Sequence, residues 1–108
     1  MNTPQTHIFS EENLRQFSER CLESVGTTKV DSAIVTDNMI QANLRGEDSH
    51  GVQLLPIWVN RIKYGGIKTN APMEVVQDYP STALINANDG IGQVVAVKAM
   101  DIAVEKAS

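Results

Sequence analysis

Cysteine is nearly absent from this chain of 108 residues, which contains only one. A single thiol excludes an intramolecular disulfide framework and is typical of a reducing compartment. Aromatic residues make up 5% of the chain, which is little for a self-sufficient hydrophobic core. No apolar run approaches the roughly 18 residues that a membrane span needs, and no apolar stretch follows a basic one at the start, as in a signal peptide. We therefore expect a cytoplasmic protein that does not enter a membrane.

Basic residues are also few. Nine Lys and Arg residues stand against thirteen Asp and Glu residues, which gives a formal net charge of −4. No stretch gathers Lys and Arg into the patch that nucleic acids or anionic membranes require. The segment 52–63 could be taken for a DNA-recognition helix, but it offers only Arg61 and Lys63 as cations. We therefore expect no nucleic-acid partner.

What is present is a globular composition with helical patterning. Hydrophobic residues make up 42% of the chain, and a chain of this size can bury one modest core. After a loose tail over residues 1–8, Ser10 is placed to cap a first helix, which Gly26 ends. The apolar stripe expected on this helix consists of Leu14, Phe17, Cys21 and Val25.

Two further helices are expected between the first helix and residue 63. Asp31 is a suitable N-cap for the second helix, and Gly46 is a suitable residue just beyond its end. The third helix is expected over 52–63. Pro56 lies inside that range, although proline is tolerated only in the first turn of a helix.

The last third of the chain predicts a hairpin and one more helix. Two short apolar runs, 73–76 and 83–86, fit antiparallel strands joined by a loop longer than two residues. The segment 89–92 that follows has two glycines where a dinucleotide fingerprint needs three, so a tight strand-to-helix turn is favoured. A final helix then reaches Ser108 without a stop signal.

Together these patterns predict a mixed α and β fold (α/β in the broad sense, with segregated α+β elements). A pair of strands is marginal by itself, so we expect residues 1–108 to be the N-terminal portion of a single larger subunit. Its parts would be the tail, a helical part over 9–66 with the loop Asp48-Ser49-His50-Gly51, and a strand pair with a truncated helix over 67–108.

His50 is the first candidate for chemistry. It lies in a polar loop between Gly46 and Gly51, beside Asp48 and Ser49. An imidazole that titrates near neutrality can pass a proton to or from a reacting oxygen, and a neighbouring carboxylate can orient it. Surface loops without any catalytic role show the same local pattern, so both interpretations stand on these residues alone.

Other reactive sites fit the sequence less well. Glu47 and Asp48 occupy the place where a nucleophile elbow requires glycine. Ser49 and His50 are adjacent, so their side chains are expected to diverge rather than pair. Asp48 and His50, with Glu47 as a doubtful third ligand, are too few for zinc, and we expect no metal site. Cys21 lies on an apolar stripe, as a small core residue does.

A second interpretation belongs to a different class of protein. Beside its main stripe, the expected second helix carries Ile34, Ile40 and Leu44, so it is apolar around much of its circumference. This surplus would suit a small helical interaction or dimerisation module, in which the loop has no catalytic role. The uncovered face of an incomplete enzyme explains it equally well.

The run ANLRGEDSHGV, from Ala42 to Val52, is more specific than any of these features. It closely resembles the signature of the malate/L-lactate dehydrogenase family that lacks a Rossmann fold, which includes ureidoglycolate, sulfolactate and diketogulonate oxidoreductases. The agreement continues in order, so that the resemblance covers residues 10–108. The matching positions beyond the run include Leu55-Pro56, Arg61-Ile62, Gly65-Gly66, Asp89-Gly90-Ile91-Gly92-Gln93 and Ala99-Met100.

This resemblance implies a homodimeric enzyme that exchanges hydride between NAD(P)H and the carbonyl of a 2-oxo acid. His50 matches the motif histidine, which would exchange a proton with the substrate oxygen. Ser49 would be its hydrogen-bonding neighbour in the substrate pocket. Arg45 would either hold the substrate carboxylate or serve the structure by capping helix carbonyls or pairing with Asp48, and both uses remain open.

The resemblance also marks what this stretch of sequence leaves undecided. In the family, most nicotinamide contacts, a catalytic lysine and a second functional histidine lie further along, so no cofactor-binding residue is assigned and the separate chain is expected to be inactive. Leu54 stands where many members have an arginine, and Trp58 where an aromatic residue, often tyrosine, is usual. Loss of that arginine would change the substrate preference or weaken binding, unless a shifted register turns Gln53 toward the pocket.

Overall fold

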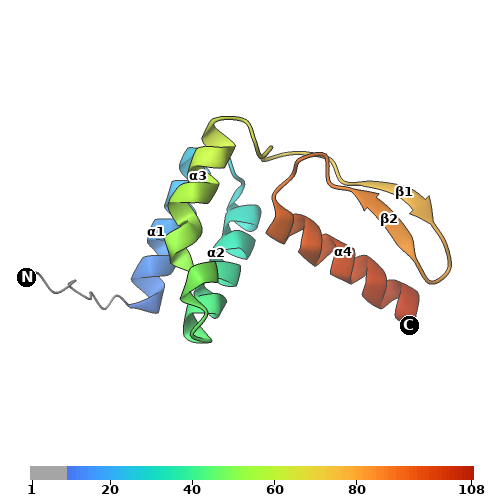
Figure 1. Cartoon of the computed structure of the whole chain (residues 1–108), viewed down its shortest axis with the longest axis horizontal. Helices are drawn as coiled ribbons and strands as arrows, with labels where there is room; N and C mark the ends of the chain where they lie inside the picture. Colours follow the sequence, from blue (N-terminus) through green and yellow to red (C-terminus); the bar gives the residue numbers. More distant parts are fainter. Residues whose placement is uncertain (1–9) are drawn as a thin grey trace, which may run out of the picture.

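Residues 10–108 are described by the computed structural model, so the tail expected over residues 1–8 lies outside the described part. Within 10–108 the chain forms four α-helices, two short 3₁₀ helices and one antiparallel pair of strands (Figure 1). The predicted mixed α and β fold is confirmed. The bounds are α1 Glu11–Ser24, α2 Lys29–Leu44, η1 Asp48–His50, η2 Val52–Leu54, α3 Leu55–Lys63, β1 Glu74–Asp78, β2 Ala83–Asn86 and α4 Gly92–Ala107.

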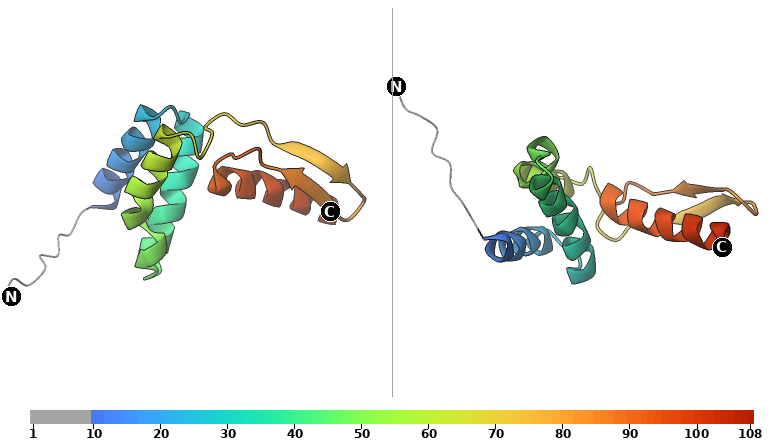
Figure 2. Two further views of the ribbon diagram at one scale, coloured as in Figure 1. Left: turned by 45° about the horizontal axis from the view of Figure 1, so that its top comes forward. Right: turned by 90° about the horizontal axis from the view of Figure 1, so that it is seen from below.

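The elements form two groups that lie side by side. The helices α1, α2 and α3 pack together, and α4 lies beside them with the hairpin running along it (Figures 1 and 2). Lys106 on α4 ties the hairpin down, because its Nζ pairs with the carboxylate of Asp78 and donates to the carbonyl of Tyr79 at 2.6 Å. No helix within residues 10–108 has both the length and the apolar character that crossing a membrane requires.

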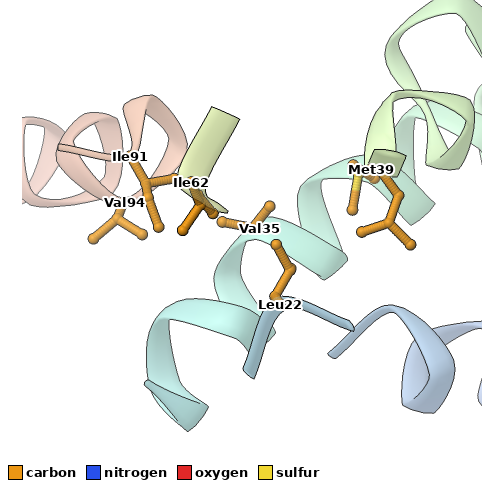
Figure 3. Close-up of a cluster of buried hydrophobic side chains, with 7 residues drawn as sticks. Leu22, Val35, Met39, Ile62, Ile91 and Val94 are labelled. Carbon is orange, nitrogen blue, oxygen red and sulfur yellow. The ribbon is translucent and has the colours of Figure 1, made fainter. Parts of the chain in front are cut away.

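The hydrophobic core lies where the two groups meet. Ile91 and Val94, at the start of α4, are buried against side chains of the three-helix group (Figure 3). Cys21 is half-buried and packs against this cluster, as its position on an apolar stripe predicts. The helix α4 is therefore anchored through its first turn. The other core residues are Leu22, Val35, Met39, Leu55 and Ile62.

One of the two predicted N-caps is correct. Ser10 caps α1, because its Oγ accepts the N–H of Asn13 at 3.1 Å. The assignment of Asp31 to the N-cap of α2 is wrong: the Oγ1 of Thr28 accepts the N–H of Asp31 at 3.1 Å, and α2 begins at Lys29. Asp31 therefore lies in the first turn, where a carboxylate favours the positive end of the helix dipole.

The buried face of α1 differs from the predicted stripe. Leu22 is fully buried, but Phe17 is 59% exposed, and the fully buried neighbour is Ser18. The helix α2, which packs on α1, also buries two hydroxyl side chains, Ser32 and Thr36. Small side chains on both helices allow a close approach, which leaves a large ring no room between them. The face of α1 is thus rotated by one residue.

An ion-pair network on the surface also joins α1 to α2. The guanidinium of Arg15 contacts Glu11 at 3.1 Å on its own helix and Asp37 at 3.1 Å on α2. The hydrogen bonds with Glu11 and then Asp37 raise the pKa of Arg15 above its ordinary value.

The third helix begins later than predicted, because Pro56 sets its boundary. The residues Val52–Leu54 form a 3₁₀ turn, and α3 starts at Leu55. Pro56 therefore falls in the first turn, where the missing N–H would have no acceptor within the helix.

The predicted hairpin is confirmed, with a longer first strand. β1 pairs antiparallel with β2, from Glu74 opposite Asn86 to Asp78 opposite Ala83. The pairing shifts between Val75 and Gln77, as in a β-bulge. Residues 77–78, which were expected in the loop, therefore belong to β1.

Candidate functional site

The loop that carries His50 begins at the C-terminus of α2. Gly46 has a φ of +81°, a left-handed conformation that glycine adopts at little cost. The N–H of Gly46 donates to the carbonyl of Asn43 at 3.0 Å, and the N–H of Glu47 donates to that of Ala42 at 2.8 Å. This pair of bonds is a Schellman motif, which satisfies the last helical carbonyls. The predicted end of the helix is confirmed, and the loop leaves it in a fixed direction.

The side chain of Asn43 fastens the far end of the loop to α2. Its Nδ2 donates to Oδ1 of Asp48 at 2.8 Å, and its Oδ1 accepts the N–H of Val52 at 2.8 Å. Gly51 is buried against the same amide, because a Cβ on Gly51 would lie 2.3 Å from Asn43 Oδ1. The loop over residues 47–52 is therefore held by α2 at both of its ends.

Between these two attachments, η1 brings Ser49 and His50 together. The N–H of His50 donates to the carbonyl of Glu47 at 3.0 Å, which closes the turn. Ser49 Oγ then lies 3.1 Å from His50 Nδ1, within hydrogen-bond distance. The expectation that these adjacent side chains diverge is wrong, because the 3₁₀ turn allows the hydroxyl to reach the ring.

This arrangement leaves one nitrogen of His50 available for chemistry. The side chain is exposed, and Nε2 has no hydrogen-bond partner among residues 10–108. A serine hydroxyl both donates and accepts, so Ser49 can accompany the imidazole in either protonation state. The loop can therefore present Nε2 to a group outside these residues while Nδ1 stays bound.

Arg45 lies at the C-cap of α2, away from the contacts around His50. It lines a hollow of about 440 Å³ between α2 and α4, which it shares with Asp37, Gln41 and Gln93. The pairing of Arg45 with Asp48 that the sequence allows is not formed, since Asp48 accepts from Asn43 instead. The structure thus joins Ser49 to His50 but does not bring Arg45 into contact with them.

The two positions that depart from the sequence signature follow the loop directly. Leu54 ends η2 and is half-buried, whereas Gln53 beside it is exposed. Trp58 packs against the core, and the guanidinium of Arg61 lies 5.7 Å from the centre of its ring. The buried Nε1 of Trp58 has no partner among residues 10–108. Leu54 offers no charge to a carboxylate at this position.

The segment 89–92 forms the tight strand-to-helix turn that the sequence favours. Asn88 and Asp89 have φ values of +52° and +61°, and the N–H of Gly90 donates to the carbonyl of Ala87 at 2.9 Å. These are the features of a type I′ turn. The carbonyl of Asp89 also accepts the N–H of Lys68 at 2.8 Å. The Gly90 N–H and the Asp89 carbonyl are thus engaged within the chain.

The described residues contain neither a complete dinucleotide fingerprint nor a cluster of metal ligands. The glycine pair that could approach a pyrophosphate belongs to the turn just described. No group of three or more His, Cys, Asp or Glu residues in the part of the chain that the structure describes could hold a metal ion.

Asn43 is the site residue to which the sequence analysis assigned no role. It lies within the run from Ala42 to Val52, but a helical position five residues before Asp48 carries no motif of its own. The sequence offers one signal for this role. An asparagine in the last turn of a helix is followed, in the next loop, by an acidic residue and a glycine. Asparagine in that place can bond to the backbone and to a side chain together.

Comparisons with known proteins agree on one family. The sequence profile of the malate/L-lactate dehydrogenase family matches residues 9–108. The malate dehydrogenase of Pyrococcus abyssi is 44% identical over 104 residues, which are 96% of this chain and 27% of that protein. This chain thus spans less than a third of the length of that relative.

Solved structures show the same relation at the level of the fold. The malate dehydrogenase of Pyrococcus horikoshii is 40% identical, with a TM-score of 0.88 over 90% of this chain and 28% of that chain. The sulfolactate dehydrogenase of Methanocaldococcus jannaschii is 34% identical, with a TM-score of 0.89 over 94% of this chain and 29% of that chain. The helices and hairpin described above match the N-terminal part of such structures.

Proposed function

Because the chain belongs to the malate/L-lactate dehydrogenase family, we propose that it supplies the proton-transfer loop of an NAD(P)-dependent oxidoreductase. The reaction would interconvert a 2-hydroxy acid and a 2-oxo acid, with His50 as proton donor and acceptor. The observation that supports this role is the contact of Ser49 Oγ with His50 Nδ1 at 3.1 Å, which leaves Nε2 to the substrate.

The chemistry explains why an imidazole suits this place. When a hydride reaches the carbonyl carbon of a 2-oxo acid, negative charge develops on the oxygen, and a proton must arrive as it does. His50 gives that proton from Nε2 in the direction of reduction and takes it back in the direction of oxidation. Nδ1 keeps its hydrogen before and after this transfer, so it donates to the Ser49 hydroxyl in both states, and this bond leaves Nε2 as the nitrogen that exchanges the proton.

Substrate binding divides between a polar contact and a charge. Ser49 is the nearest hydrogen-bonding side chain to the imidazole, and it would also face the substrate. Arg45 is the candidate for the substrate carboxylate, because guanidinium and carboxylate form paired hydrogen bonds. A malate-like or sulfolactate-like substrate carries a second anionic group. With Leu54 in place of a cation close to His50, the charges that bind such a substrate would come from Arg45 and from elsewhere in the enzyme.

The cofactor would be NAD or NADP, which supplies or accepts the hydride. A relative that is 30% identical over 98 residues, from Escherichia coli O157:H7, is a ureidoglycolate dehydrogenase (NAD(+)). In this proposal the dinucleotide is bound by other parts of the enzyme, and residues 10–108 contribute the proton step and part of the substrate pocket only.

The exposed apolar side chains fit an enzyme subunit in which further chain or a second subunit covers them. Val97, Met100 and Val104 on α4 are 43%, 63% and 60% exposed. In relatives more than three times as long, additional chain is available to pack on such a face. The homodimer and the cytoplasmic location implied by the sequence remain predictions.

A chimaera tests the role of His50. This chain would replace the matching segment of the Pyrococcus horikoshii malate dehydrogenase, and oxidation of NADH or NADPH would be followed with several 2-oxo acids. We expect His50→Ala to lower the rate by at least about a hundredfold, the usual effect of losing a general acid. The matched control is His7→Ala, which removes the other histidine and should leave the rate unchanged.

Two results would contradict the proposal. A His50→Ala chimaera with the parent rate would reject His50 as the proton donor. Turnover by the separate 108-residue chain with any 2-oxo acid would show that residues 1–108 hold the cofactor themselves, against the division of roles given above.

A further inference from the structure

We propose that Asn43 is a positioning residue for His50, and that its side-chain amide sets the geometry of the loop over residues 47–52. This inference rests on the proposed function of His50. Asn43 touches neither Ser49 nor His50 in the hydrogen bonds of the described residues, so it would act through the backbone of the loop.

The first step is that one amide group makes both side-chain attachments between α2 and the loop. Its Nδ2 holds the carboxylate of Asp48 at the start of η1, and its Oδ1 holds the N–H of Val52 at the start of η2. His50 lies between these two points, two residues from each. A shift of either point would therefore move the imidazole.

The second step is that Gly51 packs against the side-chain amide of Asn43 with no room for a larger residue. Gly51 is buried, and a Cβ on it would lie 2.3, 2.4 and 2.5 Å from Oδ1, Cγ and Nδ2 of Asn43. The backbone next to His50 thus passes directly over the amide plane. The loop is in van der Waals contact with Asn43 as well as hydrogen-bonded to it, which fixes its height above α2.

The third step is that no other residue type supplies both bonds at this length. Aspartate would accept from Val52 but would repel the carboxylate of Asp48, and leucine would leave the N–H of Val52 without its partner. Asn43 thus engages one oxygen of Asp48, whereas the Ser49 hydroxyl is the group that meets Nδ1 of His50.

An exchange of the two side chains gives the sharpest test. In Asn43→Asp the new carboxylate faces that of Asp48, whereas in Asn43→Asp with Asp48→Asn the amide and the carboxylate have changed places. The double variant keeps the net charge and can form both bonds again, with Asp48→Asn donating to the new carboxylate. Asp48→Asn alone keeps an acceptor for Nδ2 of Asn43. Asn60→Asp, at an exposed position on α3, is the matched control.

In the chimaera described above, we expect Asn43→Asp to lower kcat by about tenfold to a hundredfold, since displacement of a reacting group by about 1 Å has effects of this size. The KM for the nicotinamide cofactor should not change. The double variant should recover kcat to within about threefold of the parent, and Asn60→Asp should match the parent. The rates are compared per folded enzyme, at a temperature where circular dichroism shows every variant to be folded.

The 108-residue chain provides a second readout that needs no activity. In Asn43→Ala the Val52 amide loses its acceptor, so its hydrogen exchange, followed by NMR, should quicken by about fivefold to tenfold. In Asn43→Asp this acceptor is kept, and the exchange rate should change less. Exchange at Leu22 in the core serves as the reference for global unfolding.

The outcomes separate this inference from the function on which it rests. If His50→Ala is inactive but Asn43→Asp has the parent kcat, Asn43 does not position His50, and the inference alone fails. A double variant no better than Asn43→Asp, or an unchanged Val52 exchange rate in Asn43→Ala, also overturns it. A fully active His50→Ala chimaera instead overturns the role of His50, and this inference with it.

Discussion

Replacement of Gly51 by alanine should damage the loop through a single neighbour. A Cβ at position 51 would lie 2.3 Å from Oδ1 of Asn43, far inside van der Waals contact, so the amide must rotate away. Rotation breaks the bonds to Asp48 and Val52. The neutral bond contributes about 1 kcal/mol and the bond to the carboxylate about 2 kcal/mol. Alanine also lowers the conformational entropy of the unfolded chain, which stabilises the folded state by about 0.5 to 1 kcal/mol. The net loss in the free energy of unfolding should therefore be about 2 kcal/mol.

The measurement is urea denaturation of the 108-residue chain, followed by circular dichroism and by the fluorescence of Trp58. With Asn43→Ala already present, the clash and both bonds are gone, so Gly51→Ala should cost nothing or stabilise by up to about 1 kcal/mol. Gly92→Ala is the control, because a Cβ there has no atom within 4 Å. Equal losses from Gly51→Ala with and without Asn43 would refute the reasoning, since the cost could not then arise from this contact.

Two further predictions test the corrected parts of the helical group. Leu22→Ala should lower the free energy of unfolding by about 2 to 5 kcal/mol, because Leu22 is fully buried, whereas Phe17→Ala should change it by less than about 1 kcal/mol. A larger loss from Phe17 would restore the face expected from the sequence. Thr28→Ala should cost about 1 kcal/mol through loss of the α2 N-cap, and Asp31→Ala no more than about half of that. Both pairs are read from urea denaturation, and a greater loss at Asp31 would mean that α2 begins there.

The sequence predicts the elements of this fold better than their contact faces. Gly46 indicates a helix end by a local rule, and the structure shows the left-handed residue and the Schellman bonds that the rule describes. The prediction that Phe17 lies on the buried face is wrong because the burial of Ser18 depends on the hydroxyl side chains of α2, which lie further along the chain. Hydrophobic periodicity contains no term for how closely two helices approach. An acidic residue suits both the cap and the first turn, so Asp31 could not be placed from the sequence alone.

The candidate site divides in the same way. His50 and Ser49 stand out from the motif, but their contact depends on a 3₁₀ turn whose dihedral angles the motif does not specify. Leu54 and Trp58 depart from the family pattern, but the pattern does not predict that Leu54 is half-buried and that Trp58 packs against the core. Asn43 was missed because its role is a pair of hydrogen bonds across a loop, and a helical position gives no sign of such bonds.

The hydrogen bonds of Asn43 span few residues, so the conformation of the loop depends mainly on the end of α2. Asn43 and Val52 are nine residues apart, and Asn43 and Asp48 only five. Closing so short a loop costs little entropy once the helix exists, so Asn43 can hold the loop without help from distant segments. The position of His50 is then set locally, whereas no residue among 10–108 meets its Nε2. Under the proposed function, one such loop would serve enzymes that differ in substrate through positions such as Leu54, where the side chain is not part of the loop's own bonds.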